Sequence, residues 1–184
     1  MSSVPERYSH VLRHDAPRLI REAMKLYGVK ERPGGANNPV ILEWADEVEA
    51  ALRTNLGYNA DSIPWCGLFA AVCAVRAGWK DQTPLQPLWA RNWRLFGQRA
   101  PTPSLGDVLV FERASAGHVG FYIADDEDAF HVLGGNQGDA VSIVRVEKGR
   151  LLAARRPRWR AAQPATVKPF PLGSMGGAFS RNET

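Results

Sequence analysis

The stretch DSIPWCGLFAAVCAVRAGW, residues 61–79, decides how the first half of the chain folds. Pro64 favours a helix start, because proline is tolerated in a first turn, and Gly78 favours a helix end. The apolar residues between them recur with helical spacing along one stripe: Cys66, Phe69, Ala70, Cys73 and Ala77. The pattern predicts a helix from just after Trp65 to about Ala77, with Cys66 in its first turn.

Two further helices are expected before this one. The first covers residues 15–27, with Asp15 as its cap and Gly28 as its end. A Pro- and Gly-rich loop follows, and Asn38-Pro39 then opens the second helix. Its apolar face is formed by Ile41, Trp44, Ala45, Val48 and Leu52.

From Gly106 onward the apolar period changes from helical to alternating. Five strands are predicted, at residues 106–113, 118–125, 129–135, 140–147 and 150–156. They begin about every eleven residues, which is typical of an antiparallel meander or small barrel. Helices followed by strands indicate an α+β fold. Between the two halves, PLWARNWRLFG at residues 87–97 is expected to be a short helical or turn-like piece.

The length of 184 residues suits one domain with a real core. We expect an N-terminal extension at residues 1–14, a single domain at 15–160, and an extended or mobile tail at 161–184. No apolar run reaches the length of a membrane span, and the N-terminus has no apolar segment typical of a secretory signal.

The formal net charge is +4. Basic residues crowd the end of the predicted sheet: Lys148, Arg150, Arg155, Arg156, Arg158 and Arg160. A solvated surface is the favoured interpretation. An acidic cell-wall polymer and a nucleic acid are the alternative partners for such a region.

The two cysteines have different surroundings. Seven positions on one helix separate their backbones by about 10 Å, which is too far for a disulfide. Cys66 lies at the helix N-terminus, where the dipole and free N–H groups lower a thiol pKa and where its own N–H can help to hold an oxyanion. Cys73 lies among apolar neighbours and is expected to be buried and inert. The alternative for Cys66 is also a small buried side chain.

A thiol nucleophile needs a base within reach. His118 opens a strand after Ala116-Gly117, and its same-face neighbour Gly120 leaves room above the imidazole. We therefore expect His118 to be the base. His131, in mid-strand between apolar residues, is the less favoured choice.

The other two histidines and a nearby turn complete the polar candidates. His10 and His14 have a metal-binding spacing but no further ligands. The turn GGNQGD offers Asn136, Gln137 and Asp139, and Asn136 is the candidate to orient the imidazole. That turn is equally explained as a hairpin that uses Gly and Asn for positive φ.

Several blocks together resemble a known family. They are GVKERPGGANNPVILEW, DSIPWCGLFAAVCAVRAGW, ARNWRLFG, LGDVLVFER, GHVGFYIAD and VLGGNQGDAVSIVRV, in family order across residues 16–158. The chain resembles the CHAP/NlpC-P60 superfamily of papain-like cysteine hydrolases, and most of all a group found in phages and prophages. The resemblance implies a papain-like fold in which the nucleophile helix packs on a five-stranded antiparallel sheet.

The resemblance also implies residue roles. Cys66 is implied to be the nucleophile, His118 the base and Asn136 the third polar residue. Asp61 matches a usually acidic position, which either holds the loop before Cys66 or contacts substrate. The usual oxyanion glutamine is missing, and Asn59 and Ser62 are the stand-ins. Some relatives bind calcium through an acidic loop, but with only Asp61 there we expect no metal and no cofactor.

The implied activity is hydrolysis of peptidoglycan amide bonds through a thioester. Gln137, Trp65, Trp89 and Trp93 are candidates to contact substrate, although core packing is favoured for the tryptophans. A protein of this kind is expected to be made in the cytoplasm without a signal peptide and to act on the cell wall after release. Its expected partners are peptidoglycan and other phage or secretion-system components, with no nucleic acid and no membrane insertion. The alternatives are an inactive wall-binding or virion structural module, and an injected antibacterial amidase toxin.

Overall fold

The computed structural model describes residues 4–113, 116–173 and 178–180. The helices in order are η1 (Glu6–Leu12), α1 (Arg18–Lys25), α2 (Pro39–Leu52), α3 (Cys66–Arg76), η2 (Lys80–Gln82), η3 (Ala90–Leu95) and η4 (Lys148–Arg150). The strands are β1 (Gln98–Arg99), β2 (Val108–Arg113), β3 (Ala116–Asp125), β4 (Ala129–Gly134), β5 (Ser142–Glu147) and β6 (Leu151–Arg156). The predicted α+β class is confirmed.

Local sequence signals determine where α1 and α2 begin. The Asn38 side chain accepts a hydrogen bond from the Val40 N–H, so this residue caps α2 as predicted. α1 instead begins at Arg18, because Pro17 disfavours helical backbone at the residue before it. Asp15 therefore caps nothing, and its carboxylate pairs with Arg13.

The sheet has six antiparallel strands in the order β1-β6-β2-β3-β4-β5, and the prediction of five was wrong by one. The missed strand, β1, consists of two exposed residues that pair with the end of β6, too short to show an alternating pattern. Strands β2 to β5 form the predicted meander. The last strand, β6, crosses over to pair with β2 instead of β5.

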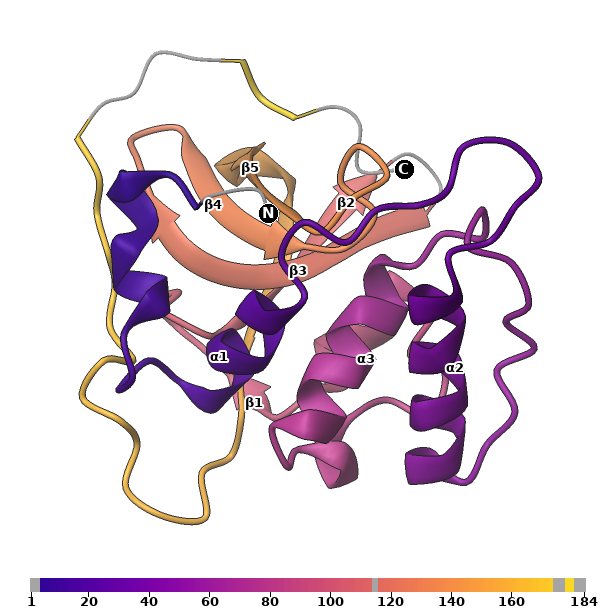
Figure 1. The fold of residues 1–184 in the computed structure, drawn as a ribbon. Helices are drawn as coiled ribbons and strands as arrows, with labels where there is room; N and C mark the ends of the chain where they lie inside the picture. Colours follow the sequence, from indigo (N-terminus) through magenta and orange to yellow (C-terminus); the bar gives the residue numbers. More distant parts are fainter. Residues whose placement is uncertain (1–3, 114–115, 174–177, 181–184) are drawn as a thin grey trace.

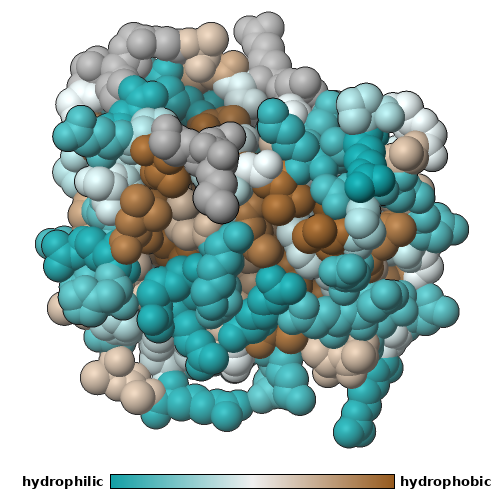
Figure 2. Space-filling view, in the orientation of Figure 1, coloured by the Kyte–Doolittle hydropathy of each residue, from teal (hydrophilic) through white to brown (hydrophobic). Residues whose placement is uncertain are grey.

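The three α-helices lie together on one side of the curved sheet, with α3 between α1 and α2 (Figure 1). α3 contacts both neighbours and β3, and every residue from Cys66 to Ala74 is buried. A second apolar cluster, built on Phe111, Tyr122 and Val132, occupies the other face of the sheet. On the face seen in Figure 2, hydrophobic residues are exposed near the centre and are surrounded by hydrophilic ones.

Both ends of the described chain lie against the sheet. Tyr8 and Val11 of η1 are buried. The segment around Phe170, drawn in yellow in Figure 1, runs beside the end of β3, where Asp125 donates its N–H to the Phe170 carbonyl and accepts from the Leu172 N–H. Within the described residues, no helix is both long enough and apolar enough to span a bilayer.

Candidate active site

Cys66 is the first residue of α3 and is only 5% exposed. Burial raises the pKa of its thiol above the ordinary value, and the backbone N–H groups of Val119 and Gly67 oppose this rise without cancelling it. The sequence predicted a lowered pKa from the helix N-terminus. The opposite holds because the cost of a buried thiolate exceeds the stabilisation from a few N–H groups. Burial therefore favours the neutral form of the Cys66 thiol.

A cleft of about 380 Å³ opens beside this thiol. Its lining is Ile63, Pro64, Cys66, Leu88, Trp89, Ala90, Arg91, Ala116 and Gly117. The wall formed by residues 87–91 comes very close to α3, since a Cβ on Gly67 would lie 2.1 Å from the Pro87 carbonyl oxygen. Trp89 is 68% exposed, so its ring borders the cleft from the solvent side.

His118 lies on β3 and is fully buried. Its Nε2 lies 3.0 Å from Oε1 of Gln137. The Gln137 amide nitrogen donates to the Ser142 carbonyl at 2.6 Å, which fixes the orientation of the amide. Because Oε1 can only accept, Nε2 of His118 must carry the hydrogen. In the neutral ring this tautomer leaves the basic lone pair on Nδ1.

Close packing holds this pair in place. A Cβ on Gly134 would lie 2.7 Å from Oε1 of Gln137 and 3.2 Å from Nε2 of His118. The imidazole also lies beside the Phe111 ring, with centroids 6.5 Å apart and planes tilted by 25°. Only glycine at position 134 leaves space for the amide to reach the imidazole.

Cys66 packs against one face of β3, whereas the His118 side chain leaves the same strand on the opposite face, so the two do not share one face of the sheet. The β2–β3 register runs without a bulge from Val108–Phe121 to Arg113–Ala116, so side chains alternate regularly along this part of β3. Val119 belongs to the core cluster that contains α3, whereas His118 leaves the strand on the other side. The sulfur lies beside the Val119 N–H, one residue after the imidazole.

Asn136, predicted to orient the imidazole, makes other contacts. Its Oδ1 accepts from the Trp65 N–H at 3.3 Å, and its Nδ2 donates to Glu31 at 2.9 Å. Asn136 has a φ of 57°, in the left-handed region that asparagine tolerates. This turn sends Asn136 toward α3 and the following residue toward His118. Gln137 therefore occupies the position expected for Asn136.

Asp61 acts on the neighbouring loop. Its carboxylate is almost fully buried and accepts from the backbone N–H groups of Arg32 at 3.1 Å and Asn38 at 2.8 Å. The Asp61 carboxylate thus ties the loop before Cys66 to the segment at residues 32–38, and its alternative role in substrate contact stays a prediction.

The remaining sequence candidates divide by exposure. Asn59 and Ser62 are exposed, and Ser62 lines a separate hollow of about 390 Å³ with Glu31 and Asp61. Trp65 and Trp93 are fully buried core residues and do not line the cleft at Cys66. Of the three tryptophans considered, Trp89 alone lines the cleft.

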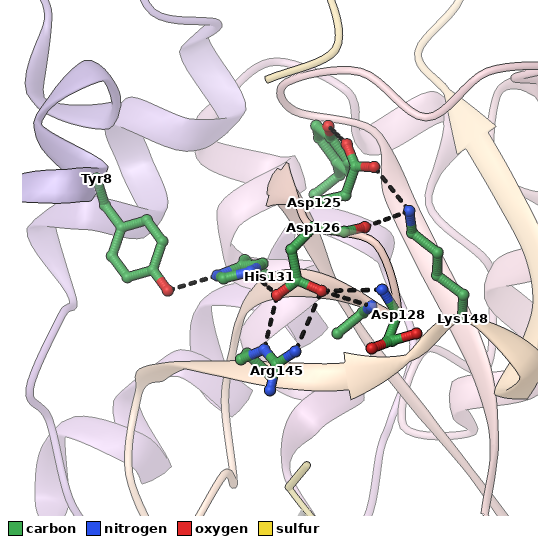
Figure 3. A network of polar contacts seen from close by, with 9 residues as sticks. Tyr8, Asp125, Asp126, Asp128, His131, Arg145 and Lys148 are labelled. Atoms are coloured by element: carbon green, nitrogen blue, oxygen red, sulfur yellow. Dashed lines mark hydrogen bonds and ion pairs between the residues drawn. The ribbon is translucent and has the colours of Figure 1, made fainter. Parts of the chain in front are cut away.

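His131 belongs to a different, buried network (Figure 3). Its Nδ1 accepts from the Tyr8 hydroxyl at 2.5 Å, and its Nε2 donates to Asp126 at 2.8 Å. Arg145 binds the same carboxylate at 2.7 Å. Burial lowers the pKa of His131 despite Asp126. Burial alone would raise the pKa of Asp126, but the hydrogen bonds from Arg145 and His131 outweigh it and lower that pKa. The network ties η1 to β4 and β5.

The histidine pair near the N-terminus has no site around it in the described ranges. His10 donates to the Ile123 carbonyl at 2.7 Å and stacks on Phe170. Across residues 4–113, 116–173 and 178–180, no three side chains of His, Cys, Asp or Glu come together in a way that could hold a metal ion.

In comparisons with known proteins, no family model, no curated protein and no solved structure matches this chain.

Proposed function

We propose that this chain is a cysteine-nucleophile amide hydrolase with Cys66 as the nucleophile. The observation that carries the proposal is the position of Cys66. Its thiol lies in the first turn of α3, borders a cleft with an exposed aromatic ring, and adjoins the strand that carries a buried histidine–glutamine pair. A structural cysteine needs no such cleft, as Cys73 deeper in α3 illustrates.

In the proposed reaction, the sulfur attacks an amide carbonyl and His118 accepts the thiol proton at Nδ1. The imidazolium then protonates the leaving amine, and water releases the acyl group from the thioester. Gln137 holds the tautomer that presents Nδ1 as the base. The N–H groups of Cys66 and Gly67 lie in the first turn of α3, close to the sulfur, and are candidates to stabilise the oxyanion.

This mechanism makes a geometric demand. His118 and Val119 leave β3 on opposite sides. Proton transfer from the sulfur to Nδ1 therefore requires the two side chains to approach each other around the backbone of β3 when substrate is bound. A raised thiol pKa fits a mechanism in which the proton moves during attack, and not one with a standing thiolate–imidazolium pair. Catalytic hydrogen bonds are often long or poorly aligned without substrate.

The substrate class and the papain-like architecture rest on the resemblance. The blocks PWC, GHVGFY and GGNQGD contain Cys66, His118 and Gln137, and together they favour bacterial peptidoglycan as the substrate. The same resemblance favours a phage or prophage lysin-like role at the cell wall.

The test is release of soluble fragments and new amino groups from purified peptidoglycan. We expect the wild-type chain and Cys73→Ala to release both, and Cys66→Ala to release neither while keeping its unfolding midpoint. Activity in Cys66→Ala would end the proposal, and so would its absence in a folded wild-type chain tested on walls of several chemotypes.

A further inference from the structure

Glu31 joins the two halves of the candidate site. Its Oε1 accepts from the Trp65 indole Nε1 at 2.5 Å and from Nδ2 of Asn136 at 2.9 Å. Asn136 in turn accepts from the Trp65 backbone N–H at 3.3 Å. These three hydrogen bonds form a closed ring among three segments that are far apart in sequence.

The ring has a consequence for the reacting groups. Trp65 directly precedes Cys66 and is the N-terminal cap residue of α3, where no side chain caps the helix. Asn136 directly precedes Gln137, the partner of His118. One carboxylate therefore holds the residue before the nucleophile and the residue before the amide that orients the imidazole.

The backbone around Glu31 keeps the carboxylate in this place. Its N–H donates to the Asp139 carbonyl at 2.9 Å, and Gly28 and Val29 exchange hydrogen bonds with Val141. Residues 28–31 thus run beside the turn that carries Asn136. On the other side of that turn, a Cβ on Gly135 would lie 2.5 Å from the Phe69 Cβ and 2.7 Å from the Trp65 ring, so the turn is pressed against α3.

We infer that Glu31 is a positioning residue for the proposed hydrolysis, acting through Trp65 and Asn136 on the placement of Cys66 and His118. This inference rests on the proposed function. Small displacements of reacting groups are costly, since a misplacement of about 1 Å can lower a rate by about 100-fold.

The experiment compares Glu31→Ala, Glu31→Gln and, as a matched control, Glu43→Ala, an exposed carboxylate on α2. All variants carry Cys73→Ala, so that Cys66 is the one thiol. With soluble peptidoglycan fragments, we expect Glu31→Ala to lower kcat by about 10-fold or more with KM within about twofold. Glu31→Gln keeps an oxygen that can accept both hydrogen bonds and should recover kcat to within about threefold.

A readout without substrate separates this inference from the proposed function. Loss of the ring loosens the first turn of α3, so iodoacetamide should alkylate Cys66 at least about threefold faster in Glu31→Ala than in Glu43→Ala. That measurement remains informative if the chain proves not to hydrolyse peptidoglycan. Unchanged kcat and unchanged alkylation in Glu31→Ala would overturn the inference.

Two further outcomes are decisive. A raised KM with unchanged kcat in Glu31→Ala would mean that the carboxylate binds substrate from the adjoining hollow, which also contradicts a positioning role. Should Glu31→Ala fail to fold, Trp65→Phe removes the indole donor together with part of the buried ring, and its unfolding midpoint is measured beside kcat. This substitution should lower kcat in the same direction, and full kcat in Trp65→Phe would overturn the inference.

Discussion

The Nε2 atom of His118 lies 3.0 Å from Oε1 of Gln137, in a pocket where a Cβ added to Gly134 would collide with the amide and crowd the imidazole. Since the Gln137 amide also donates to the Ser142 carbonyl, its oxygen has one available orientation, and this orientation sets the histidine tautomer. The orientation of the buried imidazole is therefore fixed by the turn that follows β4.

Replacing Gln137 tests that relationship. In Gln137→Ala the imidazole loses the acceptor that keeps the hydrogen on Nε2, so kcat on peptidoglycan fragments should fall by about 10- to 1,000-fold. Gln98→Ala, which removes an exposed amide on β1, is the control and should change nothing. If Gln137→Ala remains folded and keeps full kcat, the amide does not orient a catalytic base.

Trp89 gives a prediction about substrate binding. Its ring is 68% exposed at the edge of the cleft, so Trp89→Ala should leave stability unchanged and raise KM by about fivefold, equivalent to about 1 kcal/mol of lost aromatic contact. Leu95→Ala is the matched control, because Leu95 is 75% exposed but does not line the cleft. Equal KM values for the two variants would show that substrate does not lie along this wall.

The protonation state of the Cys66 thiol can be determined from the pH dependence of its alkylation. Burial raises its pKa, so the thiolate fraction at neutral pH is lower than for an ordinary cysteine. Because the thiolate is the reactive form, iodoacetamide alkylation of Cys66 should keep rising with pH beyond 9.0, the ordinary value. Cys73 serves as the internal control, since it is fully buried and its pKa is raised well above the ordinary value. A plateau below about pH 7 would instead indicate a standing ion pair.

Asp126 gives a prediction about acid stability. Burial favours its neutral form, but the hydrogen bonds from Arg145 and His131 hold its pKa below the ordinary value of 3.8. A depressed pKa contributes stability above the unfolded value, and this contribution is lost as pH falls through the folded value. Asp126→Asn should therefore cost about 3 kcal/mol at pH 7.

That deficit should shrink in acid. Urea denaturation at pH 7 and in steps below 3.8 measures it, with Asp81→Asn as a control, since Asp81 pairs with Arg160 on the surface. An equal deficit at every pH would mean that the Asp126 charge does not carry the stabilisation.

Much of the fold follows from local sequence signals. Capping residues and apolar periodicity predict the start of α2 at Asn38-Pro39 and the position of Cys66 in the first turn of α3. They also predict five of the six strands. The pairing of β6 with β2 could not be predicted in this way, because strand order depends on contacts between distant segments.

The arrangement of the candidate site was harder to predict from the sequence for a similar reason. The sequence placed an amide acceptor for the imidazole in the turn after β4, but whether Asn136 or Gln137 reaches His118 depends on one left-handed residue. The pKa of Cys66 depends on burial by residues from β3 and the segment at 87–91, which helix position alone does not include. Glu31 gave no sequence signal, since its partners are 34 and 105 positions away.

The most direct measurement is a search for the acyl-enzyme. Cys73→Ala protein is mixed with soluble peptidoglycan fragments, quenched in acid while turnover proceeds, digested and mapped by mass spectrometry. We expect a thioester adduct on Cys66 that accumulates during turnover and is absent from Cys66→Ala. Turnover without any adduct on Cys66, under quench conditions that preserve a synthetic thioester, would contradict the proposed mechanism.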